Sequence, residues 1–187
     1  FPMNDENHLV QVAASGPDTS PNIMLSTTSA IYAARQRIFI TTPYFIPVEA
    51  ISDALMQVAA TGLDVRILVP RKGDSRLVNA AAYSYYADLL KAGVRLYFYE
   101  RGFLHTKSML IDDDFSMIGT ANLDVRSQEL NFEVNALIYD KEMNASLEQE
   151  FRDDLKDASE ITLDDWSRRS RFKVFFEHLA RLLSPLL

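Results

Sequence analysis

The stretch from residue 105 to residue 122 reads HTKSMLIDDDFSMIGTAN. It contains two short apolar runs, Lys107–Ile111 and Phe115–Gly119, which only the acidic triplet Asp112–Asp114 separates. Two strand-like runs joined by so short a polar turn predict an antiparallel β-hairpin. Aspartates are common at a hairpin tip and these lack the spacing of a calcium loop, so we expect no metal site there.

Outward from this hairpin, runs rich in β-branched and aromatic residues alternate with helical patterns. This alternation is typical of a sheet covered by crossover helices, and the hairpin makes the sheet mixed. The sequence therefore predicts an α/β fold. The predicted strands are Leu9–Ala13, Arg37–Thr41, Val65–Val69, Val94–Tyr99, Lys107–Ile111, Phe115–Gly119 and Phe132–Tyr139. The predicted helices are Ile23–Gln36, Val48–Ala60, Ser75–Ala92, Lys141–Ala158 and a terminal helix from about Arg171.

Composition limits both the size of the fold and its chemistry. With 187 residues, 48% of them hydrophobic, the chain can bury the core of one medium domain. The 19 Lys and Arg against 26 Asp and Glu give a net charge of −7, which argues against a general nucleic-acid binder. There is no Cys, which excludes disulfides, thiolate zinc sites and a Cys nucleophile. Imidazole chemistry must come from His8, His105 or His178.

A candidate site begins at His105 and Lys107. On an extended backbone, residues two apart point to the same face, so an imidazole should lie beside an ammonium. Asp112 lies at an odd offset from both residues and should face the opposite way. We therefore expect that Asp112 does not touch what His105 touches.

A second extended segment adds a hydroxyl and an amide. Thr120 and Asn122 should share a face, and both can donate hydrogen bonds to phosphate oxygens. With Lys107 they would form a cradle for an oxyanion, next to the one imidazole able to attack phosphorus or move a proton. Glu133, near the start of the last strand, could hold the far nitrogen of His105 and fix its tautomer.

The stretch from residue 105 to residue 122 resembles the H-x-K-x4-D-x6-G-[ST]-x-N motif of the phospholipase D superfamily at every fixed position and spacing. The segments HLVQVAASGP, TTPYFIP, LVPRKGDS, LNFEV and SPLL extend the likeness over about residues 8–187. They are similar to the second, C-terminal catalytic half of the bacterial cardiolipin synthases. The resemblance implies a mixed sheet flanked by helices on both faces.

The resemblance also implies roles for the motif residues. His105 would be one of two catalytic histidines, acting as general acid and base, while Lys107 and Asn122 bind the substrate phosphate. Thr120 stands where the family has a small hydroxyl residue, and Glu133 where related members have the carboxylate that orients the histidine.

Two further positions take their roles from the same resemblance. Asp112 is the aspartate of the motif, for which the family implies structural support more than substrate contact. The segment TTPYFIP would lie beside the site and contribute Tyr44 as a substrate-binding residue. Arg71 and Lys72 could meet lipid phosphates or lie in a solvated loop.

The activity implied by the resemblance is a phosphatidyl transfer between two phosphatidylglycerol molecules, through a phosphohistidine and with release of glycerol. It implies no cofactor and no metal. The expected partners are phosphatidylglycerol, other phospholipids and a membrane surface, and not nucleic acid. The parent protein would reside at the bacterial inner membrane, whereas this fragment would be soluble or peripheral.

Such a reaction needs two imidazoles, and His8 and His178 lack a Lys two residues on. The second site should come from the first catalytic half of a parent chain or from a second copy of this chain about a twofold axis. We therefore expect little or no activity from this chain alone. The start at Phe1, without an initiator Met, also predicts a piece of a longer polypeptide.

Charge divides the chain into a catalytic domain, residues 1–165, and a basic tail, residues 166–187. The tail holds five basic residues and one acidic residue, with phenylalanines and leucines at helical spacing. Such a helix can lie on an anionic membrane surface or dock on the core of its own domain, and the periodicity leaves both open.

Two alternative functions remain from the sequence. One is a homodimeric phosphodiesterase, phospholipase or nuclease of the same superfamily. The other is a membrane-binding module without catalysis, which the intact motif disfavours.

Overall fold

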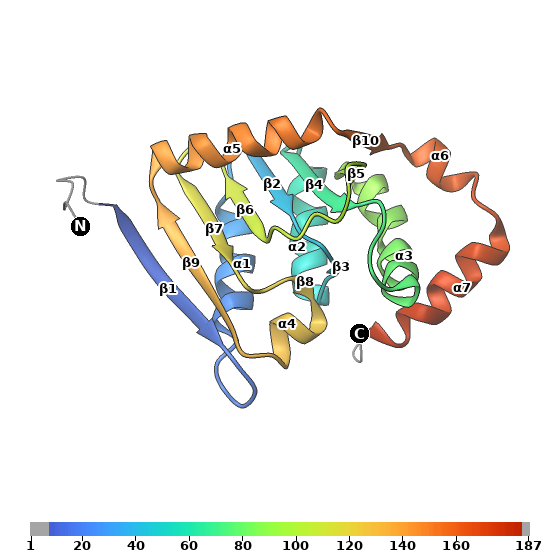
Figure 1. Cartoon of the computed structure of the whole chain (residues 1–187), viewed down its shortest axis with the longest axis horizontal. Coiled ribbons are helices and arrows are strands. Elements are labelled where there is room, and N and C mark those ends of the chain that lie inside the picture. Colours follow the sequence, from blue (N-terminus) through green and yellow to red (C-terminus); the bar gives the residue numbers. More distant parts are fainter. Residues whose placement is uncertain (1–7, 185–187) are drawn as a thin grey trace.

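The structure is a computed structural model that describes residues 8–184 (Figure 1). In chain order the elements are β1 (Leu9–Ser15), α1 (Asn22–Ala33), β2 (Arg37–Thr41), β3 (Phe45–Ile46), α2 (Glu49–Ala60), β4 (Asp64–Pro70), α3 (Arg76–Ala92), β5 (Arg95–Tyr99), β6 (Ser108–Ile111), β7 (Phe115–Gly119), β8 (Leu123–Asp124), α4 (Val125–Glu129), β9 (Glu133–Tyr139), α5 (Lys141–Leu155), β10 (Ala158–Ile161), α6 (Leu163–Ser167) and α7 (Arg171–Arg181).

Eight of these strands form one mixed sheet. The order across it is β1-β9-β7-β6-β2-β4-β5-β10. The central strands β2, β4 and β5 are parallel, and every other pairing in this sheet is antiparallel. The predicted hairpin is present as β6 and β7, with Ile111 opposite Phe115. The α/β prediction with a mixed sheet is confirmed.

Helices cover both faces of the sheet, and strand alternation explains why. On β2, Ile38 and Ile40 pack into the larger core with helices α1, α2 and α3, whereas Phe39 between them packs into a smaller core beneath α5. The ring of Phe39 stacks on that of Phe151 of α5, with centroids 4.9 Å apart. Figure 1 shows α5 crossing the sheet on its own, opposite the other helices. Burial on both faces makes the central strands continuously apolar.

Two predicted helix ends were wrong, and tertiary contacts explain both. The first helix ends at Ala33 rather than at Gln36, because the carboxylate of Asp112 binds the backbone N–H groups of residues 35–37. The fifth helix ends at Leu155, and Ala158–Ile161 becomes the edge strand β10 paired with β5. The Arg95–Glu160 ion pair, at 2.9 Å, joins these two strands.

The tail packs against the domain through Trp166 and one side of α7. Trp166 is 8% exposed and its ring contacts those of Tyr83, Tyr86 and Phe98. Helix α7 lies along α3 and buries Glu177 and Ala180, as Figure 1 shows at the right of the molecule. Its phenylalanines point outward. No helix within residues 8–184 is long and apolar enough to cross a bilayer.

Candidate functional site

Most of the candidate residues lie at one end of the sheet because of the directions in which the strands run. Because β6 runs antiparallel to β2 and β7, its first residue Ser108 lies opposite Thr41 and Ile118. The loop before Ser108, the segment after Gly119 and the start of β9 at Glu133 therefore meet there. Asp112 follows the last residue of β6 and lies at the other end of that strand.

His105 and Lys107 lie side by side in the loop that leads into β6. The Lys107 ammonium donates to Nε2 of His105 at 3.1 Å and to the main-chain oxygen of His105 at 2.9 Å. The imidazole is exposed, as a group that must meet an external substrate has to be. The predicted juxtaposition of imidazole and ammonium is therefore present.

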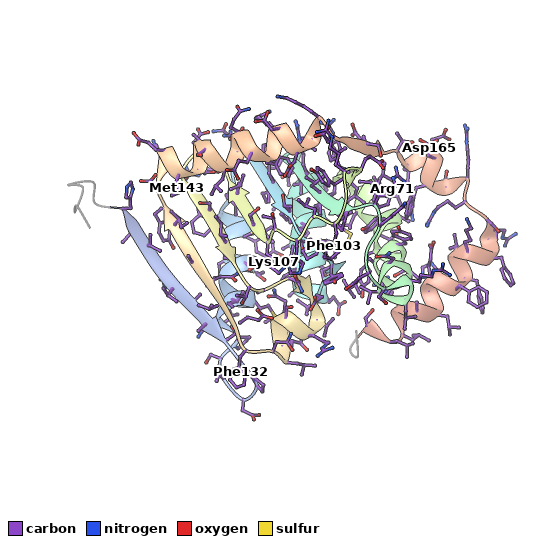
Figure 2. The ribbon with its side chains drawn as sticks, in the orientation of Figure 1. Arg71, Phe103, Lys107, Phe132, Met143 and Asp165 are labelled. Atoms are coloured by element: carbon purple, nitrogen blue, oxygen red, sulfur yellow. The ribbon has the colours of Figure 1, made fainter. Side chains whose placement is uncertain are left out.

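Phe103 completes this part of the site, and sequence analysis missed it. Its ring stacks on the His105 ring, with centroids 5.5 Å apart and an interplanar angle of 30°. On its other side, Phe103 approaches the ring of Tyr44 at 6.3 Å. Phe103 and Lys107 are labelled in Figure 2. The same period of two that pairs His105 with Lys107 also includes Phe103, and this signal could have found it.

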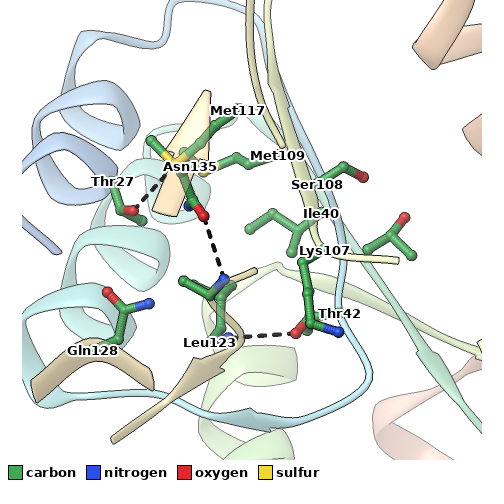
Figure 3. A pocket seen from close by; sticks show the side chains of 12 residues that line it. Thr27, Ile40, Thr42, Lys107, Ser108, Met109, Met117, Leu123, Gln128 and Asn135 are labelled. Atoms are coloured by element: carbon green, nitrogen blue, oxygen red, sulfur yellow. Dashed lines mark hydrogen bonds between the residues drawn. The ribbon is translucent and has the colours of Figure 1, made fainter. Parts of the chain in front are cut away.

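The stem of Lys107 lines a small cavity of about 20 Å³, which is room for roughly one water molecule. Figure 3 shows Lys107 beside Thr42, with Asn135 and Gln128 across the cavity. Burial lowers the pKa of Lys107 below its usual 10.5, although the charges of Glu133 and Asp124 oppose the shift. Lys107 is thus partly desolvated, which strengthens its attraction to an anion.

Asp112 supports the backbone away from this site. One carboxylate oxygen accepts from the N–H of Arg35 at 2.9 Å, and the other accepts from Gln36 and Arg37 at 2.8 and 3.0 Å. Burial acts to raise its pKa, but these three hydrogen bonds and the charge of Arg37 outweigh it and hold the pKa below 3.8. The prediction that Asp112 does not touch what His105 touches is confirmed.

The segment after β7 alternates its side chains between two cavities. Ala121 and Leu123 face the small cavity beside Lys107, whereas Asn122 and Asp124 face a second cleft. The structure therefore does not place the Asn122 side chain on the wall that Lys107 lines. The hydroxyl of Thr120 accepts from Val134 N at 2.9 Å and donates to Val134 O at 3.4 Å.

Buried amides hold this segment in place. The side chain of Asn135, a residue 6% exposed, accepts from the backbone N–H of Ala121 at 3.3 Å. The side-chain amide of Gln128 donates to the main-chain oxygen of Asn122 at 2.8 Å. Asp124 caps α4 by accepting from Ser127 N at 2.7 Å. Burial raises the pKa of Asp124 above 3.8, although hydrogen bonds from Ser127 and Asn122 oppose the shift. No local pattern in the sequence identifies Asn135, because it binds a segment on another strand's end. Gln128 reaches back six residues to Asn122, which depends on the turn of the chain into α4.

Glu133 accepts a hydrogen bond from Asn131 at 3.3 Å. The negative charge of Glu133 acts to raise the pKa of Lys107 and of Asp124. Among the described residues, the ring contacts of His105 are to Lys107 and Phe103 rather than to Glu133. The tautomer-fixing role of Glu133 stays a prediction.

The other candidates lie outside this cluster. His8 binds Asp140 at 2.6 Å, and His178 is exposed on α7. Arg71 donates to Glu100 and Ser159 and lies over the Phe98 ring, so its guanidinium is engaged within the domain. Within residues 8–184 no group of three or more His, Cys, Asp or Glu side chains is arranged to hold a metal ion.

Comparisons with known proteins agree with the site's chemistry. The family described as "Cardiolipin synthase, PLD-like domain" matches residues 27–155. Cardiolipin synthase 2 of Bacillus anthracis is 48% identical over 179 residues, which are 95% of this chain and 35% of that protein. Cardiolipin synthase of Halalkalibacterium halodurans is 46% identical, over 95% of this chain and 36% of its own length. The chain thus spans about a third of the curated relatives that it matches.

Solved structures share the fold at low identity. Nuc from Salmonella typhimurium, a phospholipase D family member, superposes with a TM-score of 0.72 at 22% identity, over 83% of this chain and 99% of its own. Phosphatidylserine synthase from Haemophilus influenzae superposes with a TM-score of 0.75 at 15% identity, over 95% of this chain and 47% of its own. These likenesses establish the fold.

Proposed function

Because the chain belongs to the cardiolipin synthase family of phospholipase D-like domains, we propose that it is one catalytic half of a phosphatidyltransferase. The enzyme transfers a phosphatidyl group from one phosphatidylglycerol to another and releases glycerol. The observation that carries this proposal is the exposed His105 imidazole held 3.1 Å from the Lys107 ammonium. An imidazole supplies proton transfer near neutral pH, and the ammonium binds the phosphate.

The proposed reaction has two displacements. In the first, an imidazole from a second half attacks phosphorus, a P–N bond forms and the P–O bond to glycerol breaks. His105 gives its proton to the departing glycerol oxygen. In the second, His105 takes the proton of an incoming hydroxyl while the new P–O bond forms and the P–N bond breaks. The Lys107 charge offsets the developing negative charge in both steps.

Three other side chains have proposed parts. Asn122 and Thr120 would donate to the phosphate oxygens. This requires the amide nitrogen of Asn122 to turn toward Lys107 and the Thr120 hydroxyl to exchange its bond to Val134 for the ligand. Glu133 would accept from Nδ1–H of His105 when substrate closes the site. Its present partner, Asn131, binds at 3.3 Å, a long hydrogen bond that such a movement can replace.

The proposal requires a second imidazole. The two other histidines, His8 and His178, lie outside the cluster, and the curated relatives are about three times as long as this chain. We infer that the second imidazole comes from the first half of a parent chain. A second copy of this chain is the other source.

Helix α7 is the surface by which we propose that this domain meets the lipid. Phe172, Phe175 and Leu182 are 72%, 64% and 75% exposed, and Arg171 and Lys173 are exposed near them. Apolar side chains flanked by cations match an anionic membrane surface. The helix is held in this orientation by Arg169, which pairs with Glu177 at 2.7 Å and lies over the Trp166 ring.

Vesicle sedimentation tests the α7 proposal. The chain should co-sediment with vesicles that contain phosphatidylglycerol more than with phosphatidylcholine vesicles. Replacing both Phe172 and Phe175 with Ser should abolish this binding, whereas Leu25→Ser, at an exposed leucine of α1, should retain it. Equal binding to both kinds of vesicle, or no effect of the double substitution, would contradict the proposal.

Product analysis tests the catalytic proposal. The two-half parent protein is incubated with phosphatidylglycerol that carries isotope-labelled headgroup glycerol. We expect labelled glycerol and a four-chain lipid in equal amounts, with a loss of about 10²–10⁴-fold in rate for His105→Ala. His8→Gln is the control and should retain the activity. Phosphatidic acid as product would indicate a phospholipase, and cleavage of plasmid DNA a nuclease.

The isolated chain tests the need for a second imidazole. It should show little or no turnover on phosphatidylglycerol vesicles. Robust turnover by a monomer that His105→Ala removes would overturn this part of the proposal. Vesicle binding without any chemistry in the two-half protein would instead indicate a membrane-binding module.

A further inference from the structure

A cleft of about 330 Å³ has Asn122 in its lining, and none of the proposed steps places a ligand in it. Its polar lining includes Tyr44, Asp74, Asn122, Asp124, Arg126 and Asn131. This volume is at the lower end of the range for small-molecule sites. The cleft is large enough for a headgroup of a few heavy atoms.

A chain of ring contacts joins the cleft to the imidazole. The Tyr44 ring lies 6.3 Å from Phe103, and the Phe103 ring stacks on His105 at 5.5 Å. Asp124, which lines the cleft, also interacts electrostatically with both Lys107 and Tyr44. A ligand whose phosphate lies at His105 and Lys107 can therefore extend its ester substituent into the cleft.

The cleft presents hydrogen-bond acceptors. Asp74 accepts from the Tyr44 hydroxyl at 2.8 Å through one carboxylate oxygen. Asp124, 7% exposed, adds a second carboxylate. The side-chain oxygen of Asn122 is buried and finds no hydrogen-bond partner within residues 8–184. A buried acceptor without a donor is costly, and a rotation of this amide that brings the oxygen to the cleft would let a ligand hydroxyl satisfy it.

The charges and hydrogen-bonding groups that line the cleft indicate which class of ligand it can bind. Two carboxylates disfavour a second phosphate in the cleft. Arg126 also lines the cleft, and its positive charge disfavours an ammonium headgroup there, whereas the Ser75 hydroxyl can both donate and accept. A hydroxyl both donates and accepts, so a neutral polyol matches the whole lining.

We propose that this cleft is the headgroup subsite, which selects a glycerol headgroup over smaller or cationic ones by hydrogen bonds to Asp74, Asn122 and Asp124. The inference rests on the proposed transfer of phosphatidyl groups and adds the basis of its headgroup selectivity. Asp74 is the specificity-determining residue that is simplest to test, because its side chain lies on an exposed loop.

The test measures binding of water-soluble lipids to the 187-residue chain by NMR. Dihexanoylphosphatidylglycerol and dihexanoylphosphatidylethanol carry the same charge and differ in headgroup hydroxyls. We expect at least about tenfold tighter binding of the glycerol lipid, with shifts at the side-chain amide of Asn122. Asp74→Asn should reduce the preference to less than about threefold. Asp153→Asn, the same change at an exposed ion-paired carboxylate of α5, should leave it unchanged.

The outcomes separate this inference from the proposed function. Three results would overturn the headgroup subsite. They are equal affinity for the two lipids, an unchanged preference in Asp74→Asn, and tighter binding of dihexanoylphosphatidylethanolamine than of dihexanoylphosphatidylglycerol. In the two-half protein, Asp74→Asn should raise KM for phosphatidylglycerol with little change in kcat. Selective binding without any transfer would contradict the proposed function and leave the subsite supported as a binding site.

Discussion

The Nζ atom of Lys107 lies 3.1 Å from Nε2 of His105 and 2.9 Å from the main-chain oxygen of the same residue. An ammonium has only donors, so Nε2 acts as the acceptor in this contact. In the proposed reaction, a phosphate oxygen that draws the ammonium away would leave Nε2 free to carry the proton that His105 gives to the departing glycerol oxygen. We therefore propose that substrate binding and exposure of Nε2 are linked in this pair of side chains.

The first prediction concerns the charge of Lys107. Lys107→Ala in the two-half protein should lower kcat/KM by about 10²–10³-fold, because a donor aimed at the developing phosphate charge is lost. Steady-state kinetics on phosphatidylglycerol vesicles measures this. Lys156→Ala, at an exposed lysine beyond the end of α5, is the control. A loss smaller than about threefold would show that Lys107 does not contact the phosphate.

The second prediction concerns pH. Burial lowers the pKa of Lys107, against the charges of Glu133 and Asp124, so its ammonium deprotonates below the usual 10.5. Phosphate affinity should therefore fall as the pH rises through this lowered pKa, before an ordinary lysine would titrate. NMR titration of the Lys107 side chain measures the pKa directly, and a value at or above 10.5 would refute the prediction. Lys107→Arg should extend binding to higher pH.

The third prediction concerns stability and Asp112. Asp112→Ala should lower the free energy of unfolding by about 1–3 kcal/mol at pH 7, because three backbone N–H groups lose a charged acceptor that water replaces in part. Since the folded-state pKa is below 3.8, the contribution is present above that pH and is lost as the pH falls through the lowered value.

Urea unfolding of both proteins between pH 7 and pH 3 measures this difference. Asp113→Ala, whose side chain is 64% exposed, should cost about 0.5 kcal/mol or less. A difference between wild type and Asp112→Ala that stays constant down to pH 3 would contradict the assignment.

The fourth prediction concerns Gly119, the last residue of β7. A Cβ atom there would lie 2.3 Å from the backbone oxygen of Val134 and 2.6 Å from Cα of Asn135. Gly119→Ala must push β7 and β9 apart and should cost about 1–3 kcal/mol in urea unfolding. At Gly73 the nearest atoms belong to the Asn79 side chain, which can move, so Gly73→Ala should cost less. Equal effects would argue against close strand contact at Gly119.

Several features of this protein follow from periodicity along the chain. Two apolar runs joined by a short polar turn predicted the hairpin. The pairing of His105 with Lys107 and the separation of Asp112 from them followed from the alternation of side chains along an extended backbone. The charge and spacing of the tail also predicted a helix with apolar and basic residues. Each of these features depends on residues within a few positions of one another.

Other features depend on contacts between distant segments. The Tyr44 hydroxyl donates to Asp74, which lies 30 residues away in the sequence. The ring of Phe103 contacts the rings of both Tyr44 and His105. The predicted fifth helix extended to Ala158, but Ala158–Ile161 forms a strand, because pairing with β5 satisfies its backbone. The outward orientation of the α7 phenylalanines likewise follows from the contact of Glu177 with Arg169.

Local patterns in the sequence were enough to predict the type of fold and the placement of the His105 imidazole next to the Lys107 ammonium. Three features became visible only in the folded chain: Asn122 faces a different cavity from Lys107, carboxylates line that cavity, and α7 presents its rings to solvent. Local patterns can be read because backbone geometry repeats every two or 3.6 residues. Contacts between segments are selected by the packing and hydrogen bonding of the whole chain at once.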